Sequence, residues 1–370
     1  MEKNIYAPYA DELRRLDATG SLRVLPDGEQ EGKWITAGEC RMLNLSSNDY
    51  LGLAEDTALR DEFLSQTPSA AMRFSASSSR LLTGNFAEHR RLEQVLASLY
   101  GAEAALVFSS GYHMNAGILP ALADRRTLIL ADKLVHASLI DGLRLSAAKC
   151  MRFRHQDYDH LHALMTRHHA DFDRTIIVTE SVFSMDGDTA QLTRLVDLKL
   201  HFPGTRLYVD EAHAVGVRGR RGLGLAEEQD CLDGIDILCG TFGKALASVG
   251  AFAVCRRVIR DYLVNKMRTL IFTTALPPVN MAWTRFVVER LRERLSALSA
   301  RLRESFRQHG LPMPSESHIV PLIVGGSTDA VRTAVRMQRL GFYVLPIRPP
   351  TVPEGTSRLR FSLTAALDAA

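Results

Sequence analysis

Three ionisable residues stand just after apolar segments and could act together in catalysis. Asp210 and His213 follow a run that ends at Val209, and Lys244 follows a second run that ends at Cys239. Short apolar runs of this kind predict buried strands. The carboxyl ends of parallel strands share one edge of a sheet, where open α/β sheets bind ligands. We therefore expect Asp210 and Lys244 to lie close together.

Pyridoxal phosphate needs such a pair from its protein. A carboxylate keeps the pyridine nitrogen protonated, and a lysine amine attaches the cofactor covalently. We predict that Asp210 pairs with the ring nitrogen and that Lys244 carries the cofactor and later acts as a base beside the substrate α-carbon. His213, which follows Asp210 by three positions, is predicted to reach the ring hydroxyl.

Two further segments fit the same cofactor. Ser109-Ser110-Gly111-Tyr112-His113 follows an apolar run and opens a helical pattern, so its backbone N–H groups and the helix dipole could hold a phosphate, with Thr241 adding a hydroxyl. His136 also follows a strand candidate. A histidine there is more often structural, but in a pyridoxal site its flat ring would stack on the cofactor.

Asp210-Glu211-Ala212-His213 also matches the letters of a helicase box. A helicase needs a phosphate loop of the form G-x-x-x-x-G-K-[ST], and the chain has none. Gly243-Lys244 is followed by Ala245, and Leu238 occupies the place of the first glycine. The pattern therefore favours a cofactor site over a nucleotide-driven motor.

The remaining pattern alternates helices with short strands, which is typical of a mostly parallel sheet covered on both faces. Asn85 and Glu88 fit a capping box at the start of one helix, and an arginine-rich helix is predicted from Pro278 to Gln308. We read that arginine-rich face as solvated, because glutamates are interleaved with the arginines. The strand candidates are Ala105–Phe108, Thr127–Ala131, Ile176–Thr179, Arg206–Val209, Ile235–Cys239 and Ala251–Val254.

Composition excludes several classes of protein. The 370 residues are 46% hydrophobic and 24% charged, with a net charge of +3, which is ordinary for a globular enzyme and gives no footprint for nucleic acid. The five cysteines are scattered without a C-x-x-C pair, which indicates inert thiols in a reducing compartment. No apolar leader or membrane-length apolar run is present, so we expect a cytoplasmic protein without a membrane-spanning segment. We also expect no metal site.

Beyond these observations, the chain resembles the α-oxoamine synthases, which are fold-type I pyridoxal phosphate enzymes that condense an amino acid with an acyl thioester and release CO2. The resemblance covers nearly the whole length. It is carried by Ser46–Leu53, Ser79–Asn85, Thr179–Asp188, Phe272–Pro278 and Ile347–Pro353. The last two stretches are most similar to the members that use L-alanine and a pimeloyl thioester, carried by coenzyme A or an acyl carrier protein.

The resemblance implies a role for each matching position. Lys244, His136, Asp210 and His213 would be catalytic, and Ser184 would lie near the ring hydroxyl with His213. Glu180 would be a supporting acid. The phosphate would be held by Gly111, Tyr112 and Thr241, with Thr273 and Thr274 reaching it from the second subunit of a homodimer. Asn48 and Arg360 would bind the substrate carboxylate, and Arg23 and Thr351 would contact either the acyl substrate or the external aldimine.

The pattern along the chain, together with the resemblance, predicts an organisation in three parts. Residues 1–45 would form an N-terminal helix, including Tyr9 to Leu16, and an extended segment. Residues 46–265 would form a large cofactor-binding domain, and residues 266–370 a small α+β domain. Two departures stand out: Phe74-Ser75-Ala76-Ser77-Ser78 replaces a glycine-rich turn, and the sequence stops at Asp368-Ala369-Ala370, where the family continues into a final helix.

Two other functions remain open at this point. One is a sister enzyme that uses glycine, serine or a different acyl thioester. The other is a non-catalytic relative that serves as a binding subunit, although every catalytic position is filled.

Overall fold

The computed structural model describes residues 5–290, 296–311 and 314–367. They form two compact units. The large unit comprises residues 49–184 and 188–294, and the small unit comprises residues 1–48, 185–187 and 295–370. This grouping differs from the three-part division expected from the sequence. The N-terminal segment joins the C-terminal segment, and residues 266–290 join the large unit.

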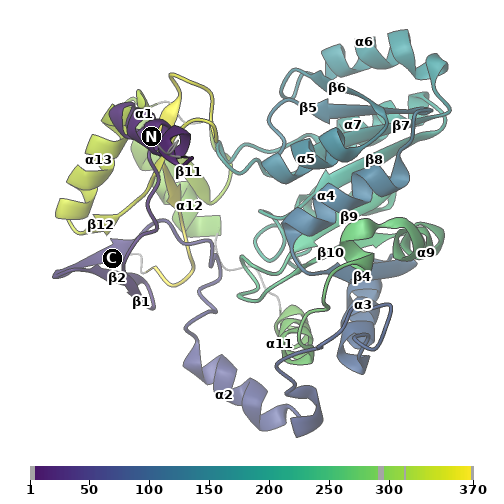
Figure 1. The fold of residues 1–370 in the computed structure, drawn as a ribbon, viewed down its shortest axis with the longest axis horizontal. Helices are drawn as coiled ribbons and strands as arrows, with labels where there is room; N and C mark the ends of the chain where they lie inside the picture. Colours follow the sequence, from purple (N-terminus) through teal and green to yellow (C-terminus); the bar gives the residue numbers. More distant parts are fainter. Residues whose placement is uncertain (1–4, 291–295, 312–313, 368–370) are drawn as a thin grey trace. The chain divides into compact units, whose positions relative to one another are not determined.

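A seven-stranded sheet forms the centre of the large unit (Figure 1). Its strand order is β4-β10-β9-β8-β7-β5-β6, and all neighbouring pairs from β9 to β6 are parallel, whereas β10 is antiparallel to both β9 and β4. The mostly parallel α/β sheet predicted from the sequence is thus confirmed. The strands are β4 (Ala104–Phe108), β5 (Thr127–Asp132), β6 (Lys149–Phe153), β7 (Arg174–Glu180), β8 (Thr205–Asp210), β9 (Ile237–Thr241) and β10 (Ala251–Cys255).

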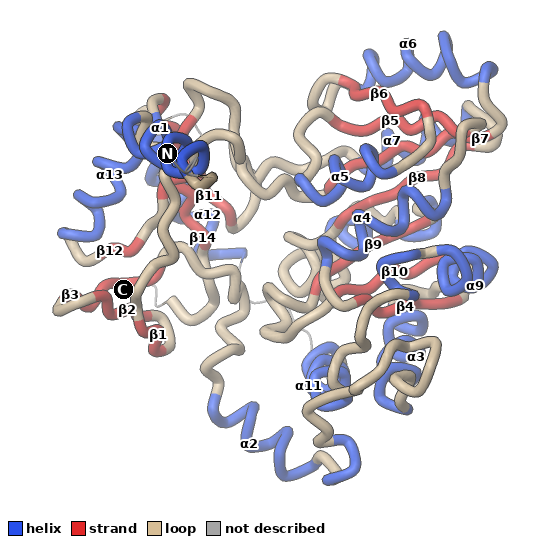
Figure 2. The backbone as a smooth tube through the Cα atoms, in the orientation of Figure 1, coloured by secondary structure: helices blue, strands red, loops and turns tan. Residues whose placement is uncertain are grey.

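Helices cover both faces of this sheet (Figure 2). One core cluster joins the sheet to α4 (Gly111–Leu122), α5 (Ala137–Leu145), α9 (Arg257–Lys266) and α10 (Arg268–Ile271) through side chains such as Ile118, Leu139 and Leu263. The inner parallel strands β5, β7, β8 and β9 are almost entirely buried, and their centres are mainly apolar. The other helices of the unit are α2 (Thr57–Gln66), α3 (Ala87–Leu99), α6 (Tyr158–His168), α7 (Leu192–His201), α8 (Leu225–Glu228) and α11 (Pro278–Val288), with short 3-10 turns η1 (Ser69–Ala71), η2 (His169–Asp171) and η3 (Leu232–Gly234).

The small unit contains two sheets. One has the order β1-β2-β3-β12 and the other β11-β14-β13. The parallel pairing of β3 with β12 explains why the N-terminal segment belongs to this unit, because it joins Leu43 and Asn44 to Phe342 and Tyr343. The elements are α1 (Ala7–Ala18), β1 (Glu29–Glu31), β2 (Trp34–Ala37), β3 (Cys40–Asn44), α12 (Ser296–Gln308), β11 (Ile319–Gly325), α13 (Ser327–Arg339), β12 (Phe342–Tyr343), β13 (Pro346–Ile347) and β14 (Ser357–Ser362).

The long helix predicted from Pro278 to Gln308 is wrong as a single element. Helix α11 ends at Val288, and α12 begins at Ser296. Residues 291–295 of that prediction lie outside the described residues. α11 packs on α3, which places residues 278–288 in the large unit.

The predicted capping box is also wrong. Phe86 is the N-cap of α3, and the Asn85 side chain instead accepts a hydrogen bond from Arg80 Nε at 2.9 Å. Arg80 in turn forms an ion pair with Glu93 at 2.8 Å.

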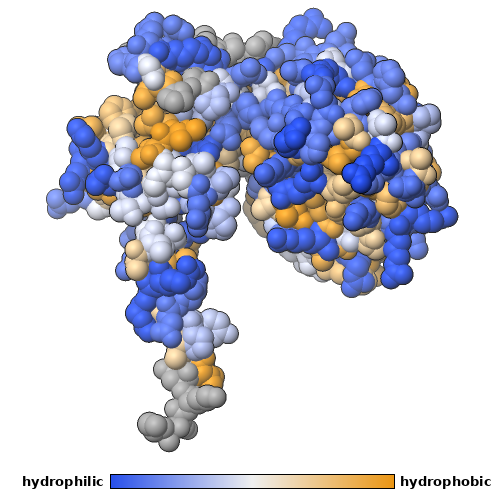
Figure 3. Space-filling view, turned by 90° about the horizontal axis from the view of Figure 1, so that it is seen from above, coloured by the Kyte–Doolittle hydropathy of each residue, from blue (hydrophilic) through white to orange (hydrophobic). Residues whose placement is uncertain are grey.

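The face of the large unit seen in Figure 3 is mainly hydrophilic, with hydrophobic side chains interspersed. Among the residues that the structure describes, none of the helices combines the length and apolar character needed to cross a membrane.

Candidate active site

Lys244 lies in the turn that follows β9, and its amine contacts a histidine from the turn after β8. The Lys244 Nζ atom is 2.8 Å from His213 Nε2. Both turns leave the carboxyl ends of adjacent parallel strands, because β8 pairs with β9 in the sheet. The shared edge therefore brings together two residues that the sequence predicts to act on one ligand.

Tyr50 holds the other side of the His213 ring. Its hydroxyl is 2.7 Å from His213 Nδ1, and its side chain is fully buried. A lysine ammonium can only donate, so His213 Nε2 accepts from Lys244. The proton of a neutral His213 then sits on Nδ1 and is donated to the Tyr50 oxygen. In this tautomer Tyr50 accepts from His213 Nδ1, and His213 Nε2 presents its lone pair to Lys244.

Asp210, the last residue of β8, is buried within a network of donors. Its Oδ2 accepts a hydrogen bond from Asn115 Nδ2 at 2.7 Å, and its Oδ1 accepts one from the Ala212 N–H at 2.9 Å. Asn115 lies on α4, where its Oδ1 accepts from Tyr208 at 2.6 Å. These hydrogen bonds hold the Asp210 carboxylate in one orientation.

His136 and Glu180 are part of the same electrostatic environment. His136 is the N-cap of α5, and its Nδ1 is 2.7 Å from Ser138 Oγ. Although His136 is exposed to solvent, desolvation by neighbouring atoms lowers its pKa; Asp210 opposes this change and Lys244 adds to it. Burial raises the pKa of Glu180 well above its ordinary value, and the nearby Asp210 raises it further. Both shifts favour the neutral forms, the imidazole of His136 and the carboxylic acid of Glu180.

The predicted phosphate site lies at the start of α4. Ser110 is the N-cap and accepts a hydrogen bond from the His113 N–H at 3.1 Å. A Cβ added to Gly111 would meet nothing closer than Thr241, at 3.8 Å from Oγ1, so the backbone here can be approached closely and Gly111 and Thr241 are neighbours. The first N–H groups of a helix have no partner within it and attract anions. The structure thus brings the predicted phosphate residues together.

The remaining predicted cofactor residues also belong to the large unit. Tyr112 follows Gly111 on α4 and donates a hydrogen bond to Asp141. Ser184 is buried in the segment after β7. Thr273 and Thr274 lie between α10 and α11. These two threonines are predicted to contact the cofactor phosphate bound by a second subunit.

The four residues predicted to bind substrate form two pairs in the small unit. Arg360 Nη1 donates to Asn48 Oδ1 at 3.2 Å, and Arg360 is buried on β14. Arg23 Nη2 donates to Thr351 Oγ1 at 3.4 Å. The sequence placed Asn48 with Arg360, and Arg23 with Thr351, in shared roles, and each pair is in contact.

Tyr50 and Asn115 were missed by sequence reasoning. Tyr50 lies within the family-like stretch Ser46–Leu53, of which only Asn48 was selected, so its position there was an available signal. Asn115 stands inside a helix with no local motif. Its role depends on α4 packing over β8, which only the fold reveals.

These residues fit pyridoxal phosphate. A buried carboxylate, a lysine amine, a flat histidine ring and a helix N-terminus next to a threonine are the groups that its ring nitrogen, aldehyde, ring face and phosphate require. All of them lie in the large unit.

Comparison with known proteins also indicates a pyridoxal phosphate enzyme. The model of the family "Aminotransferase class I and II" matches residues 41–370. A relative from Pasteurella multocida (strain Pm70), described as "Putative 8-amino-7-oxononanoate synthase", is 56% identical and covers 98% of this chain and 95% of its own length.

Two solved structures are similar over most of the chain. A structure described as SPT (serine palmitoyltransferase) with PLP has 28% identity and a TM-score of 0.89, covering 99% of this chain and 95% of its own. The 8-amino-7-oxononanoate synthase of Francisella tularensis has 28% identity and a TM-score of 0.73, covering 88% of this chain and 92% of its own. The chain therefore belongs to the aminotransferase class I and II family and, within it, to the 8-amino-7-oxononanoate synthase group of α-oxoamine synthases.

Proposed function

We propose that this protein binds pyridoxal phosphate covalently through Lys244 and condenses L-alanine with a pimeloyl thioester. The products are 8-amino-7-oxononanoate, CO2 and the free thiol, a step of biotin biosynthesis. The observation that carries the proposal is the convergence of Lys244 and His213 at 2.8 Å, with Asp210 three residues from that histidine on the adjacent strand end. The similarity to enzymes of this name supports it.

The cofactor supplies an electron sink for the bond that breaks at the substrate α-carbon. Asp210 holds a proton on the ring nitrogen, which strengthens that sink, and Asn115 keeps the carboxylate in place. Lys244 Nζ removes the α-proton, and His213 Nε2 accepts the hydrogen bond of the lysine. His136, kept neutral by its lowered pKa, offers a flat ring to the cofactor face.

In the small unit, the Arg360 guanidinium is the group that would bind the substrate carboxylate. It is already oriented by Asn48 and by a hydrogen bond to Ser362 Oγ at 2.6 Å. A planar guanidinium suits a carboxylate because it donates two parallel hydrogen bonds. Arg23 and Thr351 would contact the acyl substrate. We further propose a cytoplasmic homodimer, in which Thr273 and Thr274 serve the neighbouring subunit.

A second candidate function is a sister α-oxoamine synthase that uses serine or glycine. The TM-score of 0.89 to the serine palmitoyltransferase structure favours it as the alternative, although identity to that protein is 28%. The acyl carrier is either coenzyme A or a carrier protein, and both are acidic partners suited to a basic surface.

Replacement of Lys244 by Ala tests the proposal directly. We expect the variant to fold, to lose the visible absorbance of covalently attached cofactor, and to lose turnover by at least about a thousandfold, because the base and the attachment point are one amine. Retained turnover would refute the role of Lys244.

Incubation of the wild-type protein with pimeloyl thioesters and a panel of amino acids tests the substrate. We expect CO2 release and a product of the mass of 8-amino-7-oxononanoate with L-alanine. A clear preference for glycine or serine would select the sister function.

A further inference from the structure

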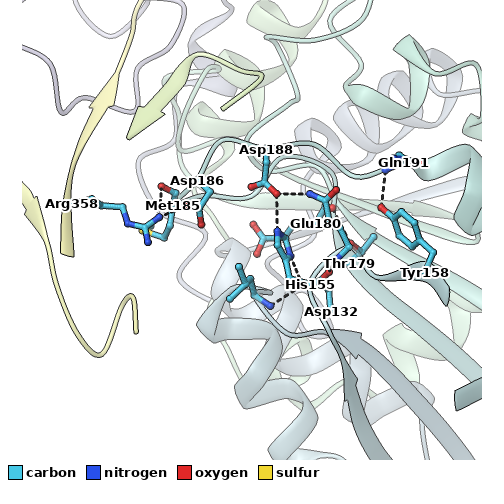
Figure 4. Close-up of polar contacts among 12 residues, drawn as sticks. Asp132, His155, Tyr158, Thr179, Glu180, Met185, Asp186, Asp188, Gln191 and Arg358 are labelled. Carbon is cyan, nitrogen blue, oxygen red and sulfur yellow. Dashed lines mark hydrogen bonds and ion pairs between the residues drawn. The ribbon is translucent and has the colours of Figure 1, made fainter. Parts of the chain in front are cut away.

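A second cluster of ionisable side chains lies at the carboxyl edge of the large-unit sheet and has no role in the function proposed above. His155 stands between two carboxylates (Figure 4). Its Nδ1 is 2.8 Å from Asp132 Oδ1, and its Nε2 is 2.7 Å from Asp188 Oδ2. Asp132 ends β5, His155 follows β6, and Asp188 lies in the segment that follows β7. One ring thus connects three neighbouring strand ends.

This arrangement requires a charged imidazole. A histidine that donates to a carboxylate from each ring nitrogen must carry both protons. Burial opposes the charge, but the hydrogen bonds to Asp132 and Asp188 outweigh it and raise the pKa of His155 to about 10. A metal does not explain the cluster, because none of the groups of His, Cys, Asp and Glu in the described residues could hold one.

Neighbouring groups fix both carboxylates. Asp132 accepts hydrogen bonds from the Leu134 N–H at 2.8 Å and the Gln156 N–H at 2.9 Å. The Gln156 side chain donates to Asp188. The Phe183 ring meets His155 edge-on, with the ring centroids 4.5 Å apart. These contacts hold the imidazole in one orientation.

Two other titratable groups near the cluster, Tyr158 and Glu180, are neutral near pH 7. Burial raises the pKa of Tyr158, on α6, to about 12, and its hydroxyl accepts a hydrogen bond from the Gln191 N–H at 2.9 Å. Glu180, at the end of β7, has a pKa well above its ordinary value, first because of burial. The Arg194 guanidinium is a further cation, which lies over the Tyr158 ring, 5.1 Å from its centroid. Asp132 and Asp188 are therefore the carboxylates that contact His155.

Asp188 belongs to a short hairpin, residues 181–190. The Phe183 N–H donates to the Asp188 carbonyl at 3.0 Å, the Ala190 N–H donates to the Ser181 carbonyl at 2.9 Å, and Val182 bridges to Thr189. Ser184, the predicted cofactor residue, lies on this hairpin. The tip, residues 185–187, belongs to the small unit, where Arg358 donates to Asp186 and the Glu316 N–H donates to the Gly187 carbonyl at 3.1 Å.

We propose that His155 is a positioning residue, whose imidazolium ties the base of the 181–190 hairpin to the sheet edge and so holds Ser184 in place for the cofactor. The inference rests on the proposed function, because it assigns Ser184 a cofactor contact. His155 acts through the hairpin and does not itself touch the reacting atoms. Without the cation, Asp132 and Asp188 would repel each other and the base of the hairpin would separate from β5.

The first test is His155→Gln, with His169→Gln as the matched control. His169 is a partly buried histidine near the opposite end of β7, and its Nδ1 is 2.9 Å from Thr175 Oγ1. We expect His155→Gln to weaken pyridoxal phosphate binding about tenfold, the value of one charge-assisted hydrogen bond, as measured by absorbance titration of the apoprotein. The control should bind the cofactor within about twofold of wild type, even if both variants unfold at lower temperature.

The second test keeps the cluster folded and uses Asp188→Asn. The asparagine oxygen can still accept from His155, but one negative charge is lost, so the pKa of His155 falls. The ratio of cofactor dissociation constants, variant over wild type, should be near one at pH 6.5 and fall about tenfold by pH 10.5, because the pKa of His155 is about 10 in the wild type, where loss of its proton leaves two facing carboxylates, whereas the variant keeps only one. Taking the ratio cancels the titration of Lys244 and of the cofactor itself.

A ratio that does not change with pH, together with wild-type affinity in His155→Gln, would overturn the positioning role. Failure of wild-type protein to bind pyridoxal phosphate would instead overturn the proposed function as well. Binding by wild type with no difference in either variant would overturn only the role of His155. The two failures are therefore distinguishable in one titration series.

Discussion

Replacement of Tyr50 by Phe removes a single oxygen from the candidate active site. That oxygen is 2.7 Å from His213 Nδ1, and Tyr50 is 0% exposed, so no solvent replaces the lost acceptor directly. A net hydrogen bond of this kind contributes about 0.5–1.5 kcal/mol. Without it, the His213 proton can move to Nε2, the atom that accepts from Lys244 at 2.8 Å. Lys244 then loses the group that takes up its proton.

We expect pyridoxal phosphate to attach to Lys244 about 2- to 10-fold more slowly in Tyr50→Phe, because the same free energy enters the barrier of the attachment step. Stopped-flow absorbance after mixing apoprotein with cofactor measures this rate. The variant should unfold only a few degrees below wild type, as expected for about 1 kcal/mol in a unit of this size.

Tyr100→Phe is the matched control. Tyr100 is also buried, and its hydroxyl donates to the Leu223 carbonyl at 2.9 Å rather than to a catalytic side chain. We expect a similar loss of stability in this variant with an unchanged attachment rate. Equal attachment rates in wild type and both variants would refute the argument that Tyr50 acts on Lys244 through His213.

Two predictions concern stability. Burial raises the pKa of Glu211 from 4.5 to about 7, so the ionised form is disfavoured in the folded protein. The contribution of Glu211 to the free energy of unfolding should therefore be fully present below pH 4.5, and the free energy of unfolding should fall by about 3 kcal/mol as pH rises through 7. Glu211→Gln should flatten that slope in urea titrations at each pH. An equally steep slope in the variant would contradict this assignment. Gly187 has φ +69°, and an added Cβ would lie 2.1 Å from the Ile319 carbonyl oxygen, whereas Gly32 has φ +55° and open space around it. Gly187→Ala should therefore cost about 2–4 kcal/mol and Gly32→Ala about 1 kcal/mol in urea unfolding, and equal losses would show that the close contact is not limiting.

Most central strands could be predicted because burial on both faces leaves a mainly apolar run at their centre. β7 and β8 show this, with predicted cores Ile176–Thr179 and Arg206–Val209. β6 was missed because Lys149 and Arg152 are exposed and interrupt its apolar run, whereas β4, at the other edge of the sheet, is buried and was predicted.

Two predictions that depended on local sequence signals alone were wrong. The Asn85 cap failed because Arg80, held by Glu93, takes the asparagine oxygen that the helix N-terminus would need. The helix from Pro278 failed because its periodic pattern continues through a break after Val288 that has no proline or glycine. In both cases a tertiary contact or backbone turn prevailed over sequence pattern.

The candidate site was predictable where residues follow strands and hard to predict elsewhere. Asp210, His213 and Lys244 were identified because each follows an apolar run that predicts a parallel strand, and parallel strands end at the same edge of the sheet. Asn115 was not identified, because its position inside a helix gives no information about which strand the helix will cover. His155 was not, because its partners come from residues 132 and 188, which no spacing rule connects to it.

The pairing of β3 with β12 sets an order of events during synthesis. A ribosome that adds about 5–20 residues per second completes residues 49–294 well before Phe342 and Tyr343 emerge. The first 48 residues of the nascent chain must therefore wait, with one side of β3 unpaired, while the seven-stranded sheet can already assemble. A chain released before β12 is made would leave that edge of β3 available for mispairing.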